Sequence, residues 1–178
     1  MNCLSNISLK GIASSCEPSL AGISEVFIGY YGDFDITVSE SAQTVSNITA
    51  ATGASTGKLY KYEFAKQTGT LTSTLTKDET NGVRYYTNEV ALQFTKLEAA
   101  KHLEFQALAA EKLVAIVKDN NGKYWLVGYD GYLSATDGTA QTGQSFGDLN
   151  GYNITLQQMS AFLPFEAQYS DFSSLINA

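Results

Sequence analysis

Alternation of apolar and polar residues along several short segments is the feature that most constrains this fold. Residues 58–64 (KLYKYEF) place Tyr60, Tyr62 and Phe64 on one side of an extended chain and Lys61 and Glu63 on the other. Residues 70–76 (TLTSTLT) and 85–94 (YYTNEVALQF) alternate in the same way. Because successive side chains of a strand point to opposite faces, the pattern predicts antiparallel strands with one buried face.

Turn-forming residues separate these segments and predict hairpins. Residues 78–82 (DETNG) lie between 70–76 and 85–94, and DNNG separates 112–118 (KLVAIVK) from 123–129 (KYWLVGY). Further β-rich runs occur at 25–38, 131–136, 151–158 and 161–165. We therefore expect a mainly β (α+β) fold of about ten strands, an antiparallel β-sandwich or barrel flanked by one α-helix.

One helix is predicted over residues 95–111, where good helix formers are dense. Thr95 and Glu98 have the spacing of a capping box, which would start the helix. At about 100° per residue, Phe105 falls on the exposed side with Lys101, so both are candidate subunit contacts. The side predicted to face the sheet consists of Leu97, Ala100, Leu103, Ala107 and Ala110.

The length predicts a single domain, 1–178, with three segments outside the strand pattern. We interpret residues 1–21 as an extended N-terminal arm, and 166–178 as a tail without an assigned structure. Residues 39–57 are almost entirely Ser, Thr, Ala, Asn and Gly, which predicts a long polar loop, either a plain surface loop or one that binds a partner. We expect that deleting residues 41–55 leaves the monomer folded. The candidate contact residues in this loop are Ser39, Thr44, Ile48 and Thr52.

Charge and composition exclude several classes of function. The formal net charge is −7 and Lys and Arg do not cluster, so a phosphate backbone would be repelled on average. No apolar run is long enough for a signal peptide or a membrane span, which predicts a chain made in the cytoplasm with no membrane partner. In that compartment Cys3 and Cys16 are expected to be reduced, although they could pair.

Residues 138–145 (GTAQTGQS) differ by one letter from the glycine-rich loop that binds nucleotide phosphates. Gln144 occupies the place of the required Lys. The residues that follow contain Gly147, Asn150 and Gly151 and then alternate as a strand, whereas a phosphate loop leads into a helix. We therefore predict an exposed polar connection between two strands and no nucleotide site.

Other candidate chemistry has simpler explanations. His102 lacks a nucleophile pattern around it and is expected on the helix surface, paired with Glu98. Asp33 and Asp35, with Asp130 or Asp137, could be imagined around calcium, but a solvated edge or turn explains them. No catalytic, cofactor-binding or metal-binding residue is assigned. The runner-up hypothesis is a β-sandwich that binds glycans through the surface aromatics Tyr30, Tyr31 and Tyr132.

From Cys16 to Leu156 the chain resembles structural proteins of tailed phages of the crAss-like and related groups. The resemblance lies in residues 16–34, 68–94, 95–109 and above all 114–156 (VAIVKDNNGKYWLVGYDGYLSATDGTAQTGQSFGDLNGYNITL). It implies a tail-tube-like fold, assembled edge to edge into a six-fold ring, with the arm and the long loop reaching neighbouring rings. It also implies a virion location, other virion proteins as partners, passage of DNA without sequence-specific binding, and no catalytic residues.

Overall fold

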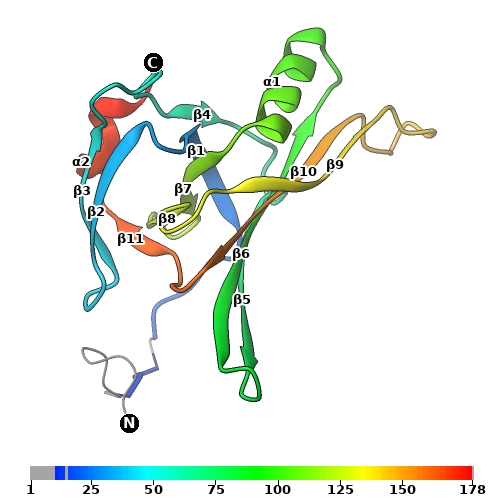
Figure 1. Cartoon of the computed structure of the whole chain (residues 1–178). Helices are drawn as coiled ribbons and strands as arrows, with labels where there is room; N and C mark the ends of the chain where they lie inside the picture. The colour runs from blue at the N-terminus through cyan, green and yellow to red at the C-terminus, as the bar shows by residue number, and fades with distance from the viewer. Residues whose placement is uncertain (1–10, 15, 178) are drawn as a thin grey trace.

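The computed structural model describes residues 11–14 and 16–177. In this part of the chain, eleven strands form two sheets and α1 is the one long helix (Figure 1). The predicted mainly β sandwich with one flanking helix is confirmed, and the described residues form no closed barrel. The elements are β1 (Ile23–Tyr30), β2 (Phe34–Ser39), β3 (Thr44–Ala50), β4 (Tyr60–Tyr62), β5 (Thr70–Asp78), β6 (Val83–Thr95), α1 (Ala99–Ala110), β7 (Leu113–Asp119), β8 (Tyr124–Val127), β9 (Ser134–Gln141), β10 (Gly151–Ser160), β11 (Phe165–Ala167), α2 (Tyr169–Phe172) and the 3₁₀ turn η1 (Ser173–Leu175).

The larger sheet has seven strands in the order β2-β3-β11-β8-β7-β1-β4. All neighbouring pairs are antiparallel except β11 and β3. The run LVAIV in β7 is buried at every position, with Leu113, Ala115 and Val117 in one core cluster and Val114 and Ile116 in another. A continuous apolar run of this length is typical of a strand covered on both faces. The larger sheet therefore separates two cores.

The smaller sheet has four antiparallel strands in the order β5-β6-β10-β9. Its register aligns Leu71, Val90 and Leu156 across three strands. Val90 and Leu156 are buried in the first core, between the sheets, and the half-buried Leu71 packs against it. The predicted hairpin of β5 and β6 is confirmed, and it extends well beyond the rest of the sheet (Figure 1). The apolar positions of the alternating strands thus lie on the side of this sheet that faces the first core.

The C-terminal residues close the second core. Phe172 in α2 is fully buried, and Leu175 is 8 % exposed. The backbone amide of Leu59 donates to the carbonyl of Leu175, and the amide of Asn177 donates to the carbonyl of Leu59. The segment 166–178, for which the sequence predicts no structure, is therefore part of the packed fold as far as residue 177.

The predicted start and orientation of the helix are wrong. Lys96 has a φ of +67°, and its amide donates to the carbonyl of Asn150, so the chain is turned out of the helical path and α1 begins at Ala99. Glu98 is the N-cap and its side chain makes no capping bond, so there is no capping box with Thr95. Leu103, expected to face the sheet, is 70 % exposed, and Leu108 is the buried residue of the helix.

The predicted polar loop over residues 39–57 is also wrong, because Ser39 ends β2 and residues 44–50 form the core strand β3. Val45 and Ile48 are buried in the second core, at 7 % and 4 % exposure. They are three residues apart, yet both point inward because the register with β2 shifts between Thr37 and Val38. Such an irregularity inserts one residue and breaks the two-residue alternation.

The N-terminal arm is described only in part, since residues 1–10 and 15 lie outside the described residues. Residues 11–14 and 16–20 have no regular strand or helix and are exposed. The side chain of Asn121 holds the arm where it joins the body, accepting from the amide of Leu20 and donating to its carbonyl. None of the helices in the described part of the chain is long and apolar enough to cross a membrane.

Candidate functional site

The residues predicted as subunit contacts do not form one surface. Ser39 and Thr44 lie at the ends of β2 and β3 and are half-buried, and Thr52 is exposed in the turn after β3. Ile48 is buried within its own chain and cannot present its side chain to a partner. Lys101 donates from Nζ to the carbonyl of Thr95 at 2.8 Å, so its ammonium group already has a hydrogen-bond partner within its own chain.

Phe105 is not the exposed aromatic that the sequence predicts. Its ring packs against the first core, 5.2 Å from the ring of Tyr152. A Cβ atom at Gly138 of β9 would lie 2.8 Å from the tip of this ring, so the glycine leaves the space that Phe105 fills. The helix turns its largest side chain toward this space, which explains why the predicted face is wrong.

Asp33 is a buried carboxylate that fixes the turn after β3. It is 6 % exposed and accepts hydrogen bonds from the amides of Ser55, Thr56 and Gly57 at 2.8, 2.8 and 3.1 Å. The Thr56 hydroxyl donates a fourth. Burial alone would raise the pKa of Asp33, but these donors outweigh it and hold the pKa below its ordinary value. Asp33 is thus an anchor of the fold rather than a cation ligand.

Substituting Asp33 by Asn is expected to destabilise the protein by about 2–3 kcal/mol, because an amide cannot accept all of these bonds with full charge. The depressed pKa adds stability above about pH 4, the unfolded value, and this stability is lost as pH falls through the folded pKa. Urea unfolding between pH 3 and 7 should therefore show a shallower pH dependence in the variant. The exposed neighbour Asp35, changed to Asn, is the control, and an equal loss in both variants would contradict the anchoring role.

The other acidic candidates do not gather around a cation. Asp130 accepts from Gln158, from the Ser160 hydroxyl and from the amide of Ala161, all at 2.8–2.9 Å, so it too fixes a turn. Asp137 is exposed on β9. Across the described residues, no group of three or more His, Cys, Asp or Glu side chains could hold a metal ion.

The structure places His102 on α1, and residues 138–145 at the end of β9 and in the loop after it. The ring of His102 lies edge-on to Tyr152 at 5.4 Å, and the Glu98 carboxylate pairs with Lys96 and Lys101 instead of the predicted His102. Residues 138–141 continue β9, and the loop after them leads into β10 rather than into a helix. Residues 138–145 therefore do not form the phosphate-binding loop that their sequence resembles.

Of the three tyrosines proposed to bind glycans, Tyr31 and Tyr132 lie together on the surface and Tyr30 does not. Tyr31 and Tyr132 are 42 % and 43 % exposed, with ring centroids 6.0 Å apart and planes 64° apart. Lys112 Nζ lies 4.7 Å from the centroid of Tyr132. Tyr30 instead packs against the first core. Two rings at this angle offer no continuous flat platform for a sugar.

The most distinctive surface belongs to the four-stranded sheet. We call its solvent-facing side the outer face, and by register it carries three charged side chains, Asp78, Glu89 and Asp137, and no Lys or Arg. Its residues are exposed or half-buried, apart from the buried Gly151. They are Thr70, Thr72, Thr74, Thr76, Asp78, Val83, Tyr85, Thr87, Glu89, Ala91, Gln93, Thr95, Ser134, Asp137, Thr139, Gln141, Gly151, Asn153, Thr155, Gln157 and Met159.

The two edges of this sheet, β5 and β9, are long and pair with one neighbour each in the described structure. Neither contains Pro, and the one Lys between them, Lys77, lies near the tip of the hairpin. Natural proteins protect edges of this kind with charges, Pro or short strands, because an unprotected edge pairs with other chains. Strand order is not visible in a sequence, so these edges could not be identified before the structure.

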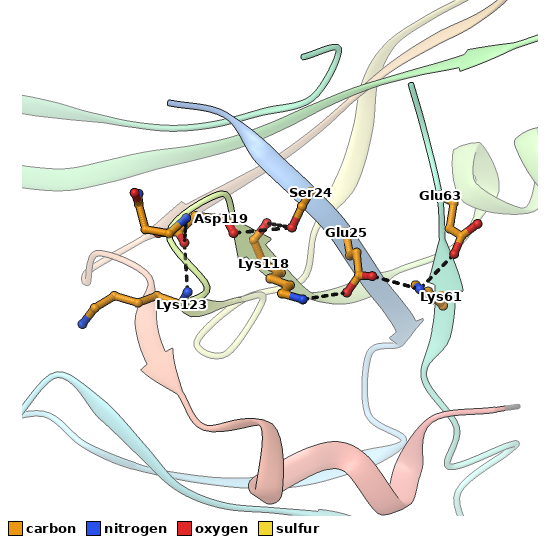
Figure 2. Close-up of polar contacts among 8 residues, drawn as sticks. Ser24, Glu25, Lys61, Glu63, Lys118, Asp119 and Lys123 are labelled. Atoms are coloured by element: carbon orange, nitrogen blue, oxygen red, sulfur yellow. Dashed lines mark hydrogen bonds and ion pairs between the residues drawn. The ribbon is translucent and has the colours of Figure 1, made fainter. Parts of the chain in front are cut away.

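The seven-stranded sheet has a better protected edge at β4, which is three residues long. Figure 2 shows the ion pairs that cover it: Lys61 contacts Glu25 and Glu63, each at 2.9 Å, and Glu25 also contacts Lys118 at 3.3 Å. The hydrogen bond from Lys61 lowers the pKa of Glu25, and Lys118 adds to this against the effect of burial. Charge on a short edge strand disfavours pairing with another chain. The other edge of the larger sheet, β2, is six residues long, so β5 and β9 are the longest open edges of the described structure and the candidate contact edges.

Comparison with known proteins adds no assignment: no family model matches the chain, and no curated protein or solved structure matches it significantly.

Proposed function

We propose that this chain is a non-enzymatic virion protein of a tailed phage, a self-assembling ring or tube subunit of the tail or head-tail connector that forms part of the DNA passage. The observation that carries the proposal is the four-stranded sheet with two long open edges, of which β9 has one register shift, and opposite faces of different character. One face is core and the other is polar. A subunit built this way completes its sheet by pairing with identical copies.

The strand order supports a closed ring. Along the sheet β5 and β10 run in one direction and β6 and β9 in the other. When copies are repeated around an axis, β9 of one copy lies antiparallel to β5 of the next. The strand pairing therefore stays antiparallel across the contact between copies. This is a heterologous contact, which closes into a ring when the rotation between copies divides a full turn. The six copies expected are those implied by the phage resemblance.

The charge distribution supports passage of DNA along the outer face. A phosphate backbone is attracted by Lys and Arg and repelled by carboxylates. The outer face has carboxylates at Asp78, Glu89 and Asp137 and no cation, and the whole chain carries a net charge of −7. DNA would therefore move past such a wall without being held.

Assembly of the purified chain tests this function. We expect light scattering and negative-stain microscopy to show rings or tubes, and we expect edge variants carrying Thr72→Lys and Thr139→Lys to lose them, since Lys at an edge opposes pairing. Thr155→Lys places the same charge on the outer face of a central strand, β10, and should keep assembly. A chain that stays monomeric at every concentration contradicts the proposal, and retention in affinity electrophoresis with glycans would favour the glycan-binding alternative.

A further inference from the structure

Phe146 is an apolar side chain without cover in its own chain. It is 115 % exposed relative to the reference state, more than any other large hydrophobic residue of the described structure. It lies in the loop 142–150 between β9 and β10, which projects far from the two sheets (Figure 1). An exposed ring of this size is a common anchor in protein contacts, where aromatic side chains fill pockets on the partner.

The loop holds a defined turn that presents this ring. Asp148 Oδ2 accepts from the amides of Gln144 and Ser145 at 2.9 and 2.7 Å, and the amide of Asp148 donates to the carbonyl of Ser145. At the base of the loop, Asn150 Oδ1 accepts from the amide of Leu97. Because these bonds fix the backbone, less conformational entropy is lost when the loop binds a partner.

A groove of about 790 Å³ lies between the start of β5, the strand β8 and the segment before β11. Its carboxylates already have partners: Asp119 accepts from the Trp125 indole at 3.2 Å, and Glu166 pairs with Lys123 at 2.8 Å. The groove is therefore suited to an uncharged segment, and residues 141–147 (QTGQSFG) carry no charge. Its apolar walls are Leu20, Ile23, Leu71, Trp125, Leu163 and Pro164.

The proposed ring contact brings this loop and this groove to the same place. If β9 of one copy pairs antiparallel with β5 of the next, the Gln141 end of β9 lies toward the Thr70 end of β5. Residues 70–73 of β5 line the groove, and the Phe146 loop follows directly after Gln141. We propose that the Phe146 loop of one copy inserts into the Trp125 groove of the neighbouring copy.

This inference rests on the proposed function, because it uses the same pairing of edges. A single loop tip in a groove buries less than the roughly 1,200 Å² typical of a stable specific interface. The insertion therefore strengthens the edge pairing and fixes its register, and it does not hold two copies together alone.

Trp125 is the single tryptophan of the chain, so its fluorescence reports directly on the groove. We expect the indole emission to shift to the blue and to become protected from acrylamide when the wild-type chain assembles. Phe146→Ser should raise the concentration needed for assembly about tenfold or more. Leu103→Ser, which removes another exposed apolar side chain from α1, is the control and should assemble like the wild type.

Complementary variants sharpen the test. Leu163→Glu places a charge in the groove at a residue that is 45 % exposed, so folding should be kept. If neither variant assembles alone, a mixture of the two should form heterodimers. The Phe146→Ser chain supplies an intact groove, and the Leu163→Glu chain supplies an intact Phe146 loop. The inference is overturned if the Phe146→Ser chain assembles normally, or if Trp125 is already protected in the monomer. A wild type that never assembles overturns the ring function as well.

Discussion

Deletion of residues 41–55 is expected to leave a chain that no longer unfolds in a cooperative transition. The deletion removes β3, and with it Val45 and Ile48 from the second core. It also removes Ser55, one of the amide donors to the buried carboxylate of Asp33. Circular dichroism and thermal unfolding would measure the loss. The composition of this segment alone led to the opposite expectation, a folded monomer.

Two point substitutions provide a graded version of the same test. Ile48→Ala should cost about 2–5 kcal/mol of unfolding free energy, the usual range for removing a buried aliphatic side chain. Thr52→Ala changes an exposed residue of the same segment and should stay within about 0.5 kcal/mol of the wild type. Equal stabilities for the deletion and the wild type would mean that β3 is not part of the core.

Gly151→Ala is expected to destabilise the protein by about 3 kcal/mol or more, near the upper end of the costs measured for overpacking. Gly151 begins β10 between Thr95 of β6 and Gln141 of β9. A Cβ at this position would overlap the carbonyl oxygen of Phe94, which belongs to the backbone of a central strand and cannot rotate away. Relief requires β6 and β10 to separate where the Phe146 loop leads into β10 and where β6 ends before α1. Denaturant unfolding measures the cost.

Gly147→Ala is the matched control. A Cβ at Gly147 meets no atom within 4 Å, so this variant should unfold like the wild type. If both glycine variants have the same stability, the close approach of the β6 and β10 backbones is not a constraint on the fold.

The sequence predicts elements well where alternation is regular and turns are marked. The β5–β6 hairpin follows from TLTSTLT, DETNG and YYTNEVALQF, and the structure pairs Leu71 with Val90 as a shared inner face requires. The pattern fails at β3, because a register shift puts Val45 and Ile48 three residues apart on one face. A low content of large apolar residues then makes a core strand look like a loop.

Features that depend on distant residues were not predictable. The position of Phe105 depends on the absence of a side chain at Gly138, more than thirty residues later. The Asp33 carboxylate accepts hydrogen bonds from the backbone amides of residues 55–57. No local sequence motif indicates these bonds, because the partners are more than twenty residues apart. The edges β5 and β9 follow from strand order, so a candidate assembly surface appears only when the sheets are known.

The place of β11 in the larger sheet has a consequence for synthesis of the chain. β11 is the one strand that joins the β2–β3 hairpin to β8 and the rest of that sheet. During translation the hairpin leaves the ribosome long before β11 does, so a nascent chain holds it without its sheet partner. Polypeptides that end before β11 would consequently lack a finished second core.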